Sequence, residues 1–216
     1  REIEYNLLQA GIELPANVEV INPDESPKRD EYRKTLWNLR KRKGLTPRDA
    51  SAALRNRNVF GMMMVKAGDA DGVVTGLNYN YGEAVRPALK ILGTRDGVTT
   101  VAGIYVMVLK NRLLFFADCT MNVSPTAEQL AEIAINTAAM ARTFDVEPKV
   151  AMLSFSNFGS TKGEESQRVQ QAVRILETRN VDFAFDGEMQ ADIAFNTELR
   201  DEVFPFSNLK GEPNVL

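Results

Sequence analysis

The chain has 216 residues, a length that allows one large domain or two small ones. It has no histidine and one cysteine, Cys119, which excludes catalytic sites built on an imidazole base and any internal disulfide. With a net charge of −3 at pH 7 there is no overall basic field, so we expect no nucleic-acid partner. The longest apolar run, residues 101–109, is far shorter than the ~20 residues of a membrane helix, and the first residues do not show a signal-peptide pattern. We therefore expect a cytoplasmic protein without membrane contact.

The first part of the chain is predicted to contain a short strand and three helices. Residues 18–21 are an apolar run typical of a strand, and residues 28–43 place apolar side chains on one helical stripe that Gly44 ends. Thr46 precedes a proline and is the expected N-cap of a second helix. Residues 60–67 continue as a third helix, whose three adjacent methionines we expect in the core.

The middle of the chain is predicted to form a strand and helix, followed by a β-hairpin. Residues 70–76 form an apolar run bounded by glycines, and residues 82–92 follow as a helix. Residues 98–109 and 113–117 are rich in β-branched and aromatic side chains, and the short polar turn between them suits a hairpin.

The last part of the chain alternates between helices and strands. Ser124 is the expected cap of a long helix that begins at Pro125, and residues 149–155 and 181–185 are the next strands, with a helix between them. This alternation predicts an α/β fold with mostly parallel sheets covered by helices on both faces. We expect two lobes, residues 1–95 and 96–216.

A polar loop after the strand at 149–155 is one candidate ligand site. It is rich in hydroxyl, amide and glycine residues and leads into a helix, a pattern that suits a phosphate; its members are Ser154, Ser156, Asn157, Gly159 and Ser160. The loop does not match the Walker A or dinucleotide motifs. A turn whose hydroxyls bond to their own backbone is the equally weighted alternative.

A second candidate is the loop that follows residues 70–76. The small residues Thr75 and Gly76 allow close backbone approach to a ligand, and Arg86 is expected near the start of the next helix. An arginine there opposes the helix dipole, which indicates either an anionic ligand or an ion pair with Glu83 or Asp71.

Two further groups of charged residues give weaker signals. Residues 40–43 are all basic, which the last turn of a helix favours without any ligand. Asp186, Glu188 and Asp192 lie near a strand end, but their spacing defines no coordination geometry, so we expect no metal site. Cys119, in an apolar setting at a strand end, is expected to be a packed thiol.

Six segments resemble the phosphate acetyl/butyryltransferase family. They are LRKRKGLT (39–46), MVKAGDADGVVTG (64–76), EAVRPALKIL (83–92), FFADCTMNVSPTAEQLAEIA (115–134), PKVAMLSFS (148–156) and DGEMQADIAF (186–195). The resemblance implies two α/β lobes like those of isocitrate and isopropylmalate dehydrogenases, with Arg40 and Arg86 lining a cleft that binds coenzyme A (CoA) and phosphate. It also implies a homodimer or higher oligomer formed through the second lobe.

Finer features are similar to one branch of the family, the C-terminal domain of bacterial NADP-dependent malic enzymes. They are SNFGS (156–160), FP (204–205) and LKGEPN (209–214). The resemblance implies a regulatory domain that binds acetyl-CoA, with NADP and a divalent metal used only by an N-terminal part absent from this sequence. The family's catalytic serine, arginine and aspartate are expected beyond Leu216, so we expect the fragment itself to be inactive and to hold no tightly bound cofactor.

Two alternatives stay open. One is a working phosphate acetyltransferase, which moves an acetyl group between CoA and inorganic phosphate. The other is a dimerisation module without enzymatic activity, in which the Ser/Gly loop binds nothing.

Overall fold

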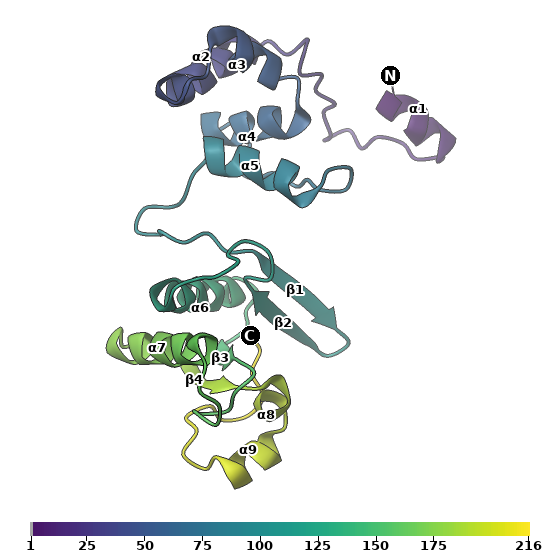
Figure 1. Ribbon diagram of the computed structural model, residues 1–216. Coiled ribbons are helices and arrows are strands. Elements are labelled where there is room, and N and C mark those ends of the chain that lie inside the picture. The colour runs from purple at the N-terminus through teal and green to yellow at the C-terminus, as the bar shows by residue number, and fades with distance from the viewer. Residues whose placement is uncertain (1) are drawn as a thin grey trace. The chain divides into compact units, whose positions relative to one another are not determined.

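A computed structural model describes residues 2–216, which divide into two compact units, one that ends at Gly93 and one that spans Thr94–Leu216 (Figure 1). No helix among the described residues is both long and apolar enough to cross a membrane.

The described part of the first unit is built from helices. They are α1 (Glu2–Gln9), α2 (Arg29–Arg40), the short 3-10 helix η1 (Lys41–Lys43), α3 (Pro47–Ala53), α4 (Arg57–Ala67) and α5 (Tyr81–Ile91). Gly44 ends η1 in the left-handed conformation with φ 86°, which glycine adopts at little cost. Thr46 caps α3 in a capping box with Asp49, because each side chain accepts a hydrogen bond from the other's backbone N–H. These predicted helix ends are confirmed.

The core of the first unit lies between α2, α3, α4 and α5. Met62 and Met63 are buried in it, as predicted. The ring of Tyr32 packs edge-on against Phe60 at 5.2 Å between centroids, and its hydroxyl donates a 2.6 Å hydrogen bond to Asp69. Burial, together with this bond to an ionised carboxylate, raises the pKa of the Tyr32 phenol. The phenol therefore remains a donor that ties α2 to the end of α4.

Two strands predicted in the first unit are wrong. Residues 18–21 and 70–76 have no strand structure, and Val74 is fully exposed. An apolar run becomes a strand only when a neighbour pairs with its N–H and C=O groups. No pairing strand occurs among residues 2–93.

The second unit combines strands and helices. They are β1 (Ile104–Leu109), β2 (Arg112–Ala117), α6 (Ala127–Arg142), β3 (Lys149–Leu153), α7 (Glu164–Thr178), β4 (Ala184–Met189), α8 (Ala191–Phe195) and α9 (Thr197–Val203). The predicted hairpin is confirmed, with β1 antiparallel to β2, whereas β3 and β4 are parallel. The cap of α6 is Thr126 rather than Ser124, because the Thr126 side chain accepts the N–H of Gln129.

A short segment at residues 213–216 joins the hairpin to the parallel pair. Val215 bridges Phe115 of β2 and Val150 of β3, parallel to both. The N–H of Phe115 donates to the carbonyl of Asn214 at 2.8 Å, and the N–H of Ala151 donates to that of Val215 at 2.9 Å. Only β1 runs against the direction of the other strands.

Helices cover both faces of the β3 and β4 pair. Val150 and Met152 of β3 pack with residues of α6 and α7 in the larger core of the unit. Ala151, which points to the opposite face, packs with Ile193 and Ala194 of α8. This is the α/β layering that the sequence predicts, restricted to a small sheet.

Candidate functional site: a cationic pocket and an apolar cavity

Four basic side chains line one pocket of about 320 Å³ in the first unit. Arg40 comes from the end of α2, Lys43 from η1, and Arg86 and Lys90 from α5. Apolar side chains form the rest of its wall; they include Leu36, Leu45, Ala53, Val59 and Ile91. None of the described residues that line it is acidic. We call this site the cationic pocket.

The four cations of this pocket are not neutralised by neighbours. Among residues 2–216, no ion pair or side-chain hydrogen bond engages any of the four. Some other basic residues of the unit are paired: Lys28 lies 3.1 Å from Asp69, and Arg29 lies 3.3 Å from Asp24. Arg40 is half-buried and the other three are exposed, so the charges are open to an anion from solvent.

Local signals place these side chains on one side of the unit. Asn80 and Glu83 form a capping box that starts α5 at Tyr81, one residue earlier than predicted. Arg86 and Lys90 are four residues apart on α5 and so share a face. Arg86 is the sixth residue of this 11-residue helix, not a first-turn residue, so the helix dipole does not explain its position. The predicted partners Glu83 and Asp71 form no ion pair with it in the described chain.

Thr75 and Gly76 line a different pocket, of about 480 Å³, on the other side of α5. Its walls include Met62, Tyr79, Ala84, Val85 and Ala88. The Thr75 hydroxyl donates a short hydrogen bond to the side chain of the buried Asn58. Thr75 thus holds its loop against α4, and the structure does not bring Thr75 or Gly76 into the cationic pocket.

The Ser/Gly loop bonds mainly to itself. Ser156 is fully buried, and its hydroxyl accepts the N–H of Thr161 at 3.1 Å. The N–H of Asn157 donates to the Ser160 hydroxyl, and that of Gly159 donates to the Glu188 carboxylate at 2.8 Å. A phosphate cradle needs free N–H groups, and the contacts of this loop match the capping-turn alternative instead. A ligand role for Ser154, Ser156, Asn157, Gly159 and Ser160 stays a prediction.

The acidic residues near the end of β4 have structural partners. The Asp186 carboxylate accepts hydrogen bonds of 2.7 Å from the Ser207 hydroxyl and from the Asn208 N–H. Glu188 is fully buried and accepts a second bond, from Gln170. No cluster of three His, Cys, Asp or Glu residues within the described chain could hold a metal.

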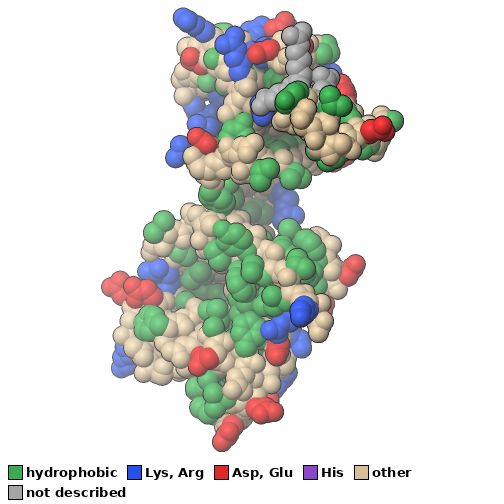
Figure 2. Space-filling model, turned by 90° about the vertical axis from the view of Figure 1, so that its right-hand side faces the viewer, with side chains coloured by type: hydrophobic (Ala, Val, Ile, Leu, Met, Phe, Trp, Pro, Cys, Tyr) green, Lys and Arg blue, Asp and Glu red, His purple; other side chains and the backbone are tan. Residues whose placement is uncertain are grey.

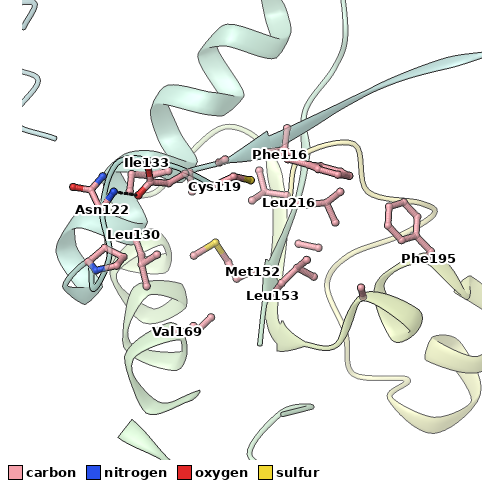
Figure 3. A pocket seen from close by; sticks show the side chains of 18 residues that line it. Phe116, Cys119, Asn122, Leu130, Ile133, Met152, Leu153, Val169, Phe195 and Leu216 are labelled. Atoms are coloured by element: carbon pink, nitrogen blue, oxygen red, sulfur yellow. Dashed lines mark hydrogen bonds between the residues drawn. The ribbon is translucent and has the colours of Figure 1, made fainter. Parts of the chain in front are cut away.

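The second unit contains a cavity of about 500 Å³ that the sequence did not predict (Figure 3). We call it the apolar cavity, because side chains such as Phe116, Leu130, Met152 and Phe195 surround it. Asp118, the one acid among the described lining residues, already accepts the backbone N–H groups of Gly103, Met121 and Asn122. The sequence could have pointed to this cavity through one signal. The cavity lies at the carboxyl ends of β2 and β3, and α/β sheets bind ligands at the carboxyl ends of their strands.

Cys119 lies in the lining of the apolar cavity and is exposed. The prediction of a packed thiol is therefore wrong. Cys119 follows the last residue of β2 by two positions, beyond the part of the strand that the sheet covers. An apolar sequence neighbourhood did not bury it because the chain leaves the sheet at Asp118, whose φ is 53°.

The architecture is a phosphotransacetylase-like α/β fold. A phosphotransacetylase from Streptococcus pyogenes superposes with a TM-score of 0.88 at 40% identity, covering 99% of this chain and 65% of that one. EutD phosphotransacetylase from Staphylococcus aureus gives a TM-score of 0.85 at 36% identity, with 99% of this chain and 66% of that one covered. The family model described as phosphate acetyl/butaryl transferase matches residues 1–216, and the chain belongs to this family.

Curated relatives fall into two kinds at similar identity. The phosphate acetyltransferase of Clostridium acetobutylicum is 41% identical over 208 residues, which cover 93% of this chain and 62% of that protein. The NADP-dependent malic enzyme of Rhizobium meliloti is 39% identical over 208 residues, which cover 95% of this chain and 27% of that protein. The chain thus spans less than two thirds of the relatives that it matches.

Proposed function

We propose that this chain is a domain that binds CoA esters, and that its parent is an NADP-dependent malic enzyme that oxidatively decarboxylates malate to pyruvate. Acetyl-CoA bound to the domain would regulate that activity. The observation that carries the proposal is the cationic pocket, in which Arg40 and Arg86 meet without acidic partners. NADP and a divalent metal would be used elsewhere in the parent protein.

The chemistry of the pocket suits the phosphorylated end of CoA. A guanidinium group can bind a phosphate through two parallel hydrogen bonds, and two lysines add charge without fixed geometry. The apolar wall formed by Leu36, Leu45 and Ile91 suits a flat, uncharged base. Regulation would follow if acetyl-CoA binds one arrangement of the parent protein more tightly than another.

Three short features support the malic enzyme branch over the acetyltransferases. They are the SNFGS loop, the Phe204-Pro205 pair and residues 209–214. The second candidate is an active phosphate acetyltransferase, which the identity of 41% to the Clostridium acetobutylicum protein favours. The test between them is formation of acetyl phosphate from acetyl-CoA and phosphate by the parent protein. Turnover would support the acetyltransferase, and binding without turnover would support the regulatory domain.

The binding proposal is tested by calorimetry with acetyl-CoA. We expect Arg86→Ala to weaken binding by about 1–3 kcal/mol, the range for loss of a charge-assisted hydrogen bond. The matched control is Arg48→Ala, because Arg48 is exposed on α3 and does not line the pocket. Equal affinity for the two variants, both folded, would remove Arg86 from the site. No binding by the unmodified protein would refute the function itself.

A further inference from the structure

The two lysines of the cationic pocket are nucleophiles that the proposed function uses only as charges. Lys43 follows Arg40 by three residues and Lys90 follows Arg86 by four, so each amine comes about one helical turn after an arginine. All four side chains line the same pocket. Neither lysine has an ion pair or a side-chain hydrogen bond among residues 2–216. Both amines are therefore open to a ligand that the arginines hold.

The size of the pocket limits which ligand can place a reactive group beside these amines. Its volume of about 320 Å³ is at the lower end of the range for small-molecule pockets. The phosphates and the thioester of a CoA ester are at opposite ends of a long molecule, so a CoA phosphate held here leaves the thioester outside. In an acyl phosphate, a single oxygen joins the phosphorus to the carbonyl carbon. Arginines that bind its phosphate therefore bring the carbonyl carbon next to the amines.

We propose that the cationic pocket also binds acyl phosphates, and that acetyl phosphate bound there acetylates Lys43 and Lys90 without a second enzyme. The uncharged amine attacks the carbonyl carbon and a C–N bond forms, while the bond between that carbon and the bridging oxygen breaks. Its electron pair leaves with the phosphate, which takes up, through solvent, the proton that the nitrogen loses. Arg40 and Arg86 favour the step because they stabilise the charge that develops on the departing phosphate.

The modification changes the charge of the pocket. Acetylation replaces an ammonium group by a neutral amide, so modification of both lysines leaves two of the four cations. The acetylation needs only a pocket that binds phosphate groups, whereas its regulatory consequence rests on the proposed function. Acetyl-CoA should bind the acetylated chain more weakly, so a high level of acyl phosphate would reduce the response of the domain to the CoA ester.

Incubation of the full chain with acetyl phosphate, followed by quantitative peptide mass spectrometry, tests the proposal. Basic side chains are exposed elsewhere on the first unit (Figure 2), and among them Lys34 and Lys66, which lie outside the pocket, serve as internal controls. We expect Lys43 and Lys90 to be acetylated roughly tenfold faster than the controls, because a bound reagent has a high local concentration. Inorganic phosphate should slow the reaction only in the pocket. Equal rates at all four lysines would overturn the proposal.

Acetic anhydride is the matched control reagent, because it transfers the same acetyl group but contains no phosphate. It should modify the lysines of the pocket and the control lysines at similar rates. An equal preference of both reagents for the pocket would show that the reactivity of the amines selects them, and it would overturn the proposal. Arg86→Ala should abolish the preference of acetyl phosphate for the pocket, whereas Arg48→Ala, a change at an exposed residue of α3, should preserve it.

Calorimetry with acetyl-CoA separates failure of this inference from failure of the proposed function. The acetylated chain should bind acetyl-CoA about three- to tenfold more weakly than the unmodified chain, because two exposed charges are lost. Uniform acetylation of a chain that binds acetyl-CoA would overturn the acyl phosphate site alone. Selective acetylation of a chain that does not bind acetyl-CoA would support that site and refute the proposed function.

Discussion

The cationic pocket of the first unit and the apolar cavity of the second differ in how their polar groups are used. In the cationic pocket, four basic side chains face solvent without an acidic partner. In the apolar cavity, the one carboxylate among the lining residues already accepts hydrogen bonds from three backbone N–H groups. A charged side chain points to a ligand only when its own protein has not already satisfied it. By this criterion we expect the cationic pocket, the smaller of the two sites, to be the one that binds an anion.

The largest expected effect comes from removing both arginines of the cationic pocket. Arg40→Ala combined with Arg86→Ala should weaken acetyl-CoA binding by roughly 100-fold or more, because two charge-assisted contacts are lost. Titration calorimetry measures this loss. Arg42→Ala combined with Arg48→Ala removes the same charge from exposed positions outside the pocket and should change affinity little. Equal losses in the two pairs would mean that only overall charge matters.

Salt concentration should affect ligand affinity differently at the two sites. Raising the salt concentration from about 50 to about 300 mM should weaken acetyl-CoA binding by about tenfold, because exposed cations are screened. An uncharged fluorescent dye bound in the apolar cavity should bind at least as tightly in high salt. Identical salt responses of the two ligands would show that the sites do not differ in this way.

A smaller effect concerns Glu132, whose carboxylate on α6 holds residues 99 and 100 of the second unit. It accepts hydrogen bonds of 2.6 Å from the hydroxyls of Thr100 and Thr99, which lower the pKa of Glu132 from 4.5 to about 2. Because the folded-state pKa is lowered, this stabilisation is complete above about pH 5 and is lost as the pH falls toward 2.

The substitution Glu132→Gln should therefore lower the free energy of unfolding by about 1 kcal/mol at pH 7, allowing for solvent screening. Urea unfolding at a series of pH values measures it. The difference from the parent protein should shrink steadily below pH 5. A difference that stays constant down to pH 2 would mean that the carboxylate's charge has no part in the bonds.

The smallest expected effect is that of Cys119→Ser. Because Cys119 lines the apolar cavity and not the cationic pocket, acetyl-CoA affinity should stay within about twofold. The exposed thiol of the parent protein should nevertheless react readily with a maleimide. A large loss of acetyl-CoA affinity in this variant would show that the apolar cavity contributes to acetyl-CoA binding, and it would contradict the distinction between the two sites.

Local signals in the sequence were enough to predict some helix ends and the hairpin. The caps at Thr46 and Gly44 depend on residues within one turn, so their sequence contains the whole interaction. The strands expected at residues 18–21 and 70–76 depend on a distant partner, which periodicity cannot supply. Long-range pairing is the part of the fold that local reasoning misses.

The candidate site, like the fold, could be predicted only in part from the sequence. Arg40 and Arg86 were singled out from sequence, but only the structure shows Lys43 and Lys90 beside them in one pocket. The Ser/Gly loop looked equally suited to a phosphate, because a sequence does not show that Ser156 is buried or that Glu188 takes the N–H of Gly159. Whether a polar group already has a hydrogen-bond partner within the protein depends on the tertiary structure.

The position of residues 213–216 between β2 and β3 bears on the order of folding. β2 ends at Ala117 and β3 begins at Lys149, yet they become joined only through Val215, which lies much further along the chain. During synthesis the hairpin and α6 emerge well before the strand that unites the sheet, and contacts between such distant residues form slowly. A ribosome-bound chain that stops short of residue 213 should therefore remain sensitive to protease around β3.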